Sequence, residues 1–152
     1  MNFYLDTEFN GFDQDKGELI SLALVTPENK EFYVRLPDPP VIDPWVEVNV
    51  MPRIGLPVTP LDMAKEQMAA FLRRFDDVDI FADYPTDLLH FLQMLLKRPD
   101  AASRVPPMTL HLVDGLSCLP VIPHHALSDA YALMEAHLKQ TKVASNVPAS
   151  LD

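Results

Sequence analysis

The stretch Asn2-Phe3-Tyr4-Leu5-Asp6-Thr7-Glu8 decides how the rest of the chain is arranged. Its apolar residues predict a buried β-strand that runs directly into two carboxylates separated by one threonine. Because side chains alternate between the two faces of a strand, Asp6 and Glu8 point to the same side. Two acids crowded in a buried setting repel each other, so a proton, a basic partner or a divalent metal must neutralise them. Further acids and a histidine occur later in the chain, and they favour the metal.

Length and composition limit the possible classes of protein. The 152 residues fit one domain with its own core. The net charge of -10 offers no basic patch for nucleic acid, unless bound metals supply positive charge locally. The single Cys118 excludes a disulfide framework and suits a reducing compartment. Asp6 interrupts the N-terminal apolar stretch too early for a signal peptide, and no apolar run is long enough to span a membrane, so we expect a cytoplasmic protein without membrane association.

Hydrophobic patterns predict the element order of an α/β protein. Short turns after the first strand predict antiparallel neighbours, and alternating helices and strands follow, which together describe a five-stranded sheet of mixed direction flanked by helices. The predicted strands cover residues 18–26, 31–35, 78–82 and 108–113, and the predicted helices cover residues 59–75, 85–98 and 124–138. Thr59 is the expected N-cap of the first of these helices, and Leu61 is the first residue expected on its apolar face. His111, in the last strand, is expected to be a core histidine with its polar atoms paired.

Prolines dominate residues 36–58 and exclude a regular element there, so we predict a long loop. Trp45 in this loop could stack on a base or, more simply, pin the loop to the core. Residues 141–152 lack hydrophobic periodicity and are expected to form a flexible tail after a single domain over residues 1–140.

Two further acids are expected on buried helix faces. Asp87 lies in the first turn of its helix, one turn before Phe91, and Asp129 lies one turn before Leu133. Three separate elements therefore direct carboxylates inward. Each acid also has a simpler interpretation: Asp87 as an acid favoured by the helix dipole, and Asp6 as an ordinary strand-end acid. Asp83 is expected to cap the helix that contains Asp87.

Three motifs together resemble those of the DEDDh exonucleases of the ribonuclease-T-like superfamily. They are Asp6-Thr7-Glu8, Ala82-Asp83-Tyr84-Pro85-Thr86-Asp87 and His124-His125-Ala126-Leu127-Ser128-Asp129-Ala130. The third is the most specific, because the family pattern there is His, any residue, Ala-Leu, any residue, Asp-Ala. In the middle motif the family usually has asparagine where this chain has Asp83. The Asp-Thr-Glu-Phe-Asn-Gly start and the proline-rich loop resemble a compact bacterial or phage exoribonuclease subgroup.

The resemblance implies a ribonuclease H-like fold and a two-metal mechanism. Two Mg²⁺ or Mn²⁺ ions would be held by Asp6, Glu8, Asp87 and Asp129, with Glu8 also counted among the catalytic residues. His124 would take the proton from the attacking water, and the spacing to Asp129 selects it over its neighbour His125. The implied activity is 3′-to-5′ hydrolysis of single-stranded RNA, with DNA possible, releasing nucleoside 5′-monophosphates. A homodimer is a further implication.

Phe9 and Asn10 directly follow the first motif and are candidate contacts to the terminal nucleotide, Phe9 by stacking. Core packing is an equal alternative for Phe9. Two other functions remain open from the sequence: a catalytically weak module of the same fold that binds nucleic acid or protein, and a phosphohydrolase of small nucleotides that uses the same carboxylates.

Overall fold

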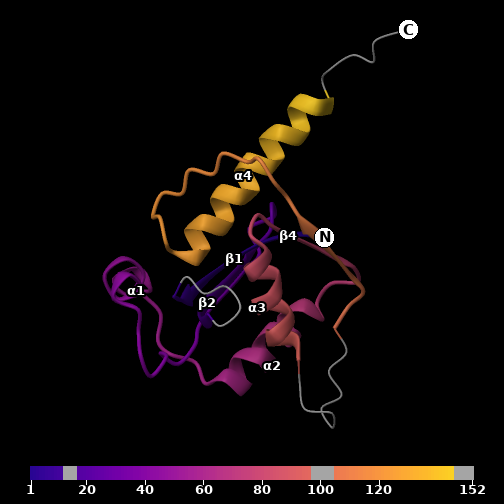
Figure 1. Cartoon of the computed structure of the whole chain (residues 1–152). Helices are drawn as coiled ribbons and strands as arrows, with labels where there is room; N and C mark the ends of the chain where they lie inside the picture. The colour runs from indigo at the N-terminus through magenta and orange to yellow at the C-terminus, as the bar shows by residue number, and fades with distance from the viewer. Residues whose placement is uncertain (12–16, 97–104, 146–152) are drawn as a thin grey trace, which may run out of the picture.

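The computed structural model describes residues 1–11, 17–96 and 105–145, and these residues form an α/β protein built on one mixed sheet (Figure 1). The five strands are β1 (Asn2–Asn10), β2 (Glu18–Val25), β3 (Glu31–Arg35), β4 (Val78–Ala82) and β5 (Met108–Leu112). Their order across the sheet is β3-β2-β1-β4-β5. Strand β2 is antiparallel to both β1 and β3, while β4 is parallel to β1 and β5 is parallel to β4. The predicted mixed five-stranded sheet is confirmed.

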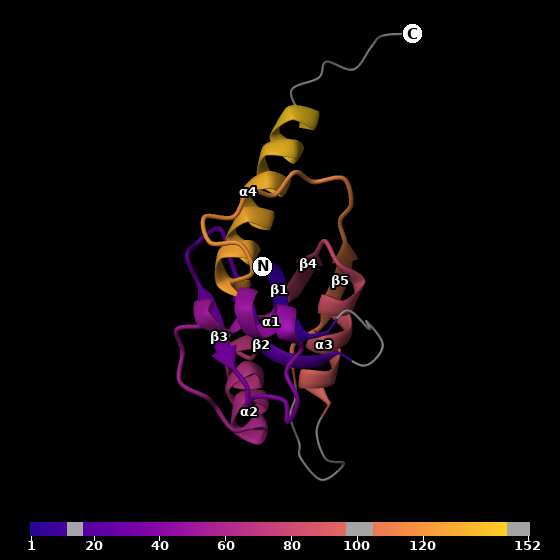
Figure 2. The same ribbon diagram turned by 60° about the vertical axis from the view of Figure 1, so that its left-hand side comes forward.

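Helices cover both faces of this sheet, as Figures 1 and 2 show from two sides. The α-helices are α1 (Pro44–Asn49), α2 (Leu61–Leu72), α3 (Pro85–Leu95) and α4 (Ala126–Ser145), and a 3₁₀ helix, η1, spans Met51–Arg53. Among the described residues, no helix combines the length and the hydropathy that crossing a membrane requires.

Alternation along β1 sends successive side chains into two separate cores. Phe3 and Leu5 pack with α2 and α3, whereas Tyr4 packs with α4. The period of two places Asp6 and Glu8 on the α4 face, in line with Tyr4. Strand β1 therefore sets the position of both acids relative to α4.

A β-bulge lies opposite the end of this acidic stretch. Glu8 pairs with Ser21, but the next residue, Phe9, pairs with Leu19, so β2 carries Ile20 as an extra residue. Ile20 joins a third, smaller core that also contains residues of the segment after β3. Its buried members are Ile20, Val46, Val50 and Ile54.

The prediction that residues 36–58 lack a regular element is wrong, because α1 and η1 form there. Pro44 occupies the first turn of α1, where a missing N–H costs nothing, and the Oδ1 of Asp43 accepts hydrogen bonds from the backbone N–H groups of Trp45 (2.8 Å) and Val46 (3.4 Å). The prolines thus start short helices in this segment.

The start of α2 also differs from the prediction. Its N-cap residue is Pro60, and no side chain caps the helix, so Thr59 is not the cap. The Thr59 N–H instead donates to the Arg35 carbonyl at 2.8 Å, beside a bridge between Arg35 and Val58. Leu61, expected on the apolar stripe, is 45% exposed. The backbone pairing with the end of β3 decides where α2 begins.

His111 is not a core residue, because β5 is an edge strand of the sheet. Its side chain is 36% exposed and stacks on Phe81 at a centroid distance of 4.4 Å. Its polar pairing was predicted correctly, since Nε2 lies 2.8 Å from Oδ1 of Asp79.

Two predicted boundaries lie near the limits of the described residues. Helix α4 continues to Ser145, past the predicted domain end at residue 140, and the rest of the predicted tail lies outside the described residues. Helix α3 ends at Leu95, and the last two residues of its predicted range, 97–98, also lie outside the described residues.

Candidate metal centre

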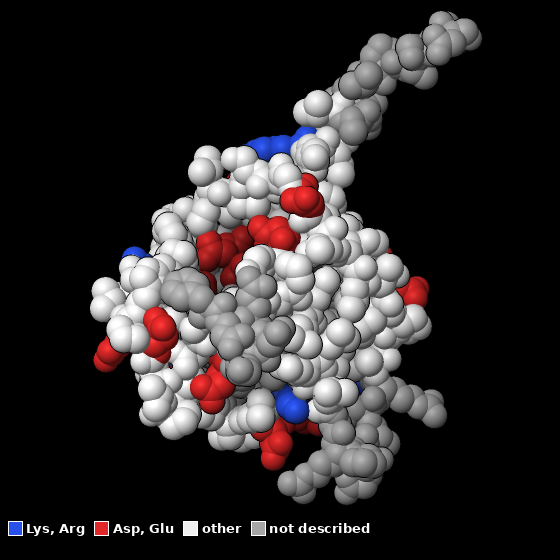
Figure 3. Space-filling view, viewed as in Figure 1, with Lys and Arg blue, Asp and Glu red and all other residues white. Residues whose placement is uncertain are grey.

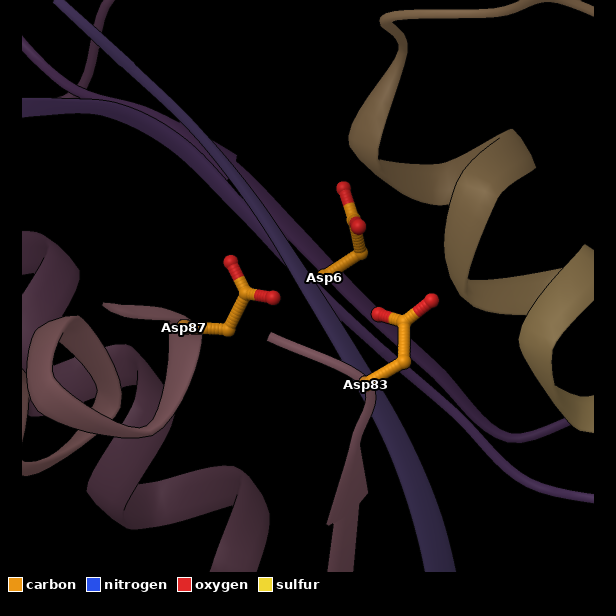
Figure 4. Close-up of side chains that lie close together, drawn as sticks. All are labelled: Asp6, Asp83 and Asp87. Atoms are coloured by element: carbon orange, nitrogen blue, oxygen red, sulfur yellow. The ribbon is translucent and has the colours of Figure 1, made fainter. Parts of the chain in front are cut away.

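The acids gather where β4 ends beside β1. Strand β4 pairs with β1 only along Asn2 to Tyr4, so β1 runs on past the end of its parallel neighbour. Asp83 directly follows β4, and Asp87 lies in the first turn of α3. Figure 4 shows the carboxylates of Asp6, Asp83 and Asp87 close together, carried by β1, the segment after β4 and the start of α3. The space beyond the carboxyl ends of parallel strands is a common ligand site in α/β proteins.

Two sets of three carboxylates meet there and share one member. Asp6, Asp83 and Asp87 form one set, and Asp6, Glu8 and Asp129 form the other. Within each set the ligand oxygens all lie within 4.8 Å of one another. Oxygen-only donor sets suit hard cations such as Mg²⁺ and Mn²⁺. All four predicted metal ligands therefore lie together, with Asp83 as a fifth acid.

Thr7 explains how Asp87 reaches this group from the opposite side of the sheet. Thr7 lies between the two acids of β1 in sequence, so its side chain points to the α3 face. Its hydroxyl donates to Oδ1 of Asp87 at 2.6 Å, and its backbone N–H is a further donor to the same carboxylate. Asp87 is only 2% exposed, so these donors orient a buried carboxylate toward Asp6.

Burial raises the pKa of every predicted metal ligand, and repulsion between the acids adds to this at Asp6, Glu8 and Asp87. For Asp6 burial comes first, followed by the charges of the other acids, and together they raise its pKa well above the usual range. Burial and the charges of Asp129 and Asp87 raise the pKa of Glu8 to about 8. Burial raises the pKa of Asp87 to about 7, although the hydrogen bonds from Thr7 lower it. Burial also raises the pKa of Asp129. Without metal, the centre retains protons at neutral pH.

Asp83 does not have its predicted role as a helix cap. Tyr84 is the N-cap residue of α3, and no side chain caps that helix. Asp83 instead faces the other acids, and its Oδ2 lies 3.8 Å from Sγ of Cys118. Burial, and then the charge of Asp83, raise the pKa of this thiol to about 11. The sequence signal that could have identified Asp83 as a ligand is its place directly after a parallel strand.

The acids line an open cavity of about 500 Å³, and Figure 3 shows acidic side chains gathered in a hollow below α4. Phe9 and Tyr84 both line this cavity, with nearly parallel rings whose centroids are 6.5 Å apart. Asn10 is not among the lining residues. Its Nδ2 donates to the Val41 carbonyl at 2.7 Å, and its Oδ1 accepts from the Asp43 N–H at 2.8 Å. Asn10 therefore ties the end of β1 to the segment before α1, and its predicted contact with substrate stays a prediction.

The two adjacent histidines have different surroundings. His124 lines the cavity, while His125 does not. The Nδ1 of His125 accepts a hydrogen bond from the Ser128 N–H at 3.3 Å, and its ring packs 5.2 Å from that of Tyr33. The His125 backbone N–H donates to Oδ2 of Asp129 at 3.0 Å. The side chain of His125 thus caps the start of α4, and that of His124 faces the acids.

In comparisons with known proteins, no protein-family model matches this chain and no curated protein is detectably similar to it.

The stability of the metal-free protein should fall as pH rises. Folding shifts the pKa of Glu8 from 4.5 to about 8 and that of Asp87 from 3.8 to about 7, so the folded state binds more protons than the unfolded chain between about pH 4 and pH 8. Urea unfolding in EDTA at pH 5.5 and pH 8.5 should give a lower free energy of unfolding at the higher pH. A Glu8→Gln variant should show a weaker fall. Equal or greater stability at pH 8.5 would contradict the proton-retaining centre.

Metal should stabilise the folded protein through Asp6. Millimolar Mg²⁺ or Mn²⁺ should raise the melting temperature of the native chain by roughly 3 to 10 °C, because the ligand binds only the folded state. Asp6→Asn should melt at or above the native temperature in EDTA, since it relieves repulsion, but should lose most of the metal-induced rise. Glu28→Gln, an exposed acid in the turn before β3, is the matched control. A full metal-induced rise in Asp6→Asn would argue against the site.

Proposed function

We propose that this protein is a metal-dependent 3′-to-5′ exonuclease that releases nucleoside 5′-monophosphates from single-stranded ends, with RNA as the preferred substrate. One observation carries the proposal: Asp6 is shared by two sets of three carboxylates, which is the arrangement that two neighbouring divalent ions require. The DEDDh motifs and the strand order β3-β2-β1-β4-β5 support a ribonuclease H-like assignment.

The residues present fit a pair of hard cations. Asp6, Glu8 and Asp129 would hold one ion, and Asp6, Asp87 and Asp83 the other. Such ions, when bound, activate water for attack on phosphorus and stabilise the charge on the leaving 3′ oxygen. The charges of the neighbouring acids raise the pKa of Asp6 further after burial. Arg53 lowers the pKa of Glu8, but burial and the neighbouring acids still raise it to about 8. Bound cations would supply the positive charge that this balance lacks.

His124 is the proposed general base. It lines the same cavity as Glu8 and Asp129, and its charge affects the carboxylate of Asp129. A neutral imidazole in this place could accept the proton of the attacking water, which the acids cannot do while they hold cations. The capping role of His125 supports the choice between the two histidines.

The charge of the chain limits how substrate can bind. With a net charge of -10, long-range attraction to a polyanion is weak, so affinity must come from the cations and from a few contacts at the 3′ terminus. Phe9 lines the cavity beside the acids and offers a ring for stacking on the terminal base. This supports single-stranded ends over blunt duplexes.

Strands labelled at the 3′ end test the reaction directly. The native chain with Mg²⁺ or Mn²⁺ should release labelled mononucleotide from linear single-stranded RNA, and more slowly from DNA, whereas EDTA should abolish release. Closed circular strands are the control and should stay intact. Cutting of circles would exclude an exonuclease. Strand binding without hydrolysis would indicate an interaction module, and hydrolysis of small nucleotides alone would indicate a phosphohydrolase.

Substitution of each histidine separates the base from the cap. His124→Ala should lower kcat by about 10² to 10⁴, the usual effect of losing a general base, while keeping the metal-induced rise in melting temperature. His125→Ala should lose about 1 kcal/mol of stability with its cap but retain activity near that of the native chain when assayed well below its melting temperature. The opposite pair of phenotypes would assign the base to His125.

A further inference from the structure

Helix α1 is attached firmly beside the metal centre, although it is only six residues long. Asn10, two residues after Glu8, binds Val41 and Asp43 through its side chain, and Asp43 in turn caps α1. On its inner side α1 packs on the apolar cluster of Ile20, Val46, Val50 and Ile54. The place of α1 relative to β1 is therefore fixed from both ends of the segment.

This attachment sets Trp45 against His124. Trp45, in the first turn of α1, has its ring centroid 4.9 Å from that of His124, with an angle of 82° between the planes. An edge-to-face pair at this distance is a favourable aromatic geometry. Both rings line the cavity that contains the acids.

The backbone segment that carries His124 is irregular. His124 precedes α4, follows Pro123 and has a φ of 59°, a left-handed conformation uncommon outside glycine. The residue itself is exposed. Its neighbour His125 is engaged elsewhere, with Ser128 and Tyr33.

We propose that Trp45 is a positioning residue that orients the imidazole of His124 toward the metal centre. The inference rests on the proposed function for its kinetic consequence, but the contact itself can be tested without activity. The inference gives the proline-rich segment over residues 36–58 a role in catalysis, because this segment carries Trp45. Trp45 would act through His124, without touching the reacting atoms itself.

A double-mutant cycle distinguishes whether Trp45 positions His124 or binds a nucleobase of the substrate. Trp45→Ala should lower kcat by roughly 3- to 10-fold, the range that one aromatic pair allows, with little change in KM. In the His124→Ala background the same substitution should have almost no further effect, because the residue it orients is gone. Trp45→Phe should restore most of kcat, since it keeps an aromatic ring. Val48→Ala, on the same helix and 70% exposed, is the matched control and should match the native chain.

Fluorescence tests the contact independently of hydrolysis. Trp45 is the only tryptophan of the chain, so its emission reports on this one place. His124→Ala should raise the emission yield by removing the ring that lies against the indole, whereas His125→Ala should leave it unchanged.

Two results would overturn the proposal. One is a Trp45→Ala effect that appears in KM and persists in the His124→Ala background, which would mean that Trp45 binds substrate directly. The other is Trp45 emission that does not respond to His124→Ala. If the native chain hydrolyses no strand, the proposed function fails, but the emission measurement still decides whether Trp45 and His124 are in contact.

Discussion

Mutual repulsion among the carboxylates beside β1 is the constraint on which the rest of this structure depends. Folding brings Asp6 and Glu8 into a buried setting with acids from two helices, which is unfavourable unless protons or cations are bound. The opposing stabilisation comes from the same strand, whose residues Phe3, Tyr4 and Leu5 are fully buried in two different cores. A strand held on both faces in this way can keep its acids in place even while they repel each other.

Local sequence patterns predicted the sheet because they agree with the final arrangement. The apolar run of β2, the alternation of β4 and the short turn between β2 and β3 each specify their element without help from distant residues. The same holds for Asp87, whose spacing from Phe91 on a helix correctly predicted that it is buried. The periodicity of strands and helices is therefore enough to place four acids on the inward faces of three elements.

Features that depend on distant contacts were not predictable in this way. Asp43 and Pro44 form a recognisable helix start, yet so short a helix persists only because Ile20, exposed to it by a bulge in β2, completes its core. Asp83 has the residue type and position of an N-cap, but its place beside Asp6 at the end of β4 turns it toward the acids. In both cases the local sequence favours a helix start, but strands that are distant in the sequence decide whether the helix persists and which way the acid points.

The irregular segments around the centre have a composition that suits a fixed site. The chain has 15 prolines and only 4 glycines, and proline reduces the conformational entropy that a segment loses on folding. Pro44 begins the helix that carries Trp45, and Pro123 directly precedes His124. Since these segments have little freedom to lose, one aromatic contact can hold a side chain that secondary structure alone would leave unoriented. Stiff loops thus complement the strand: β1 fixes the acids that repel each other, and the prolines fix the groups that face them.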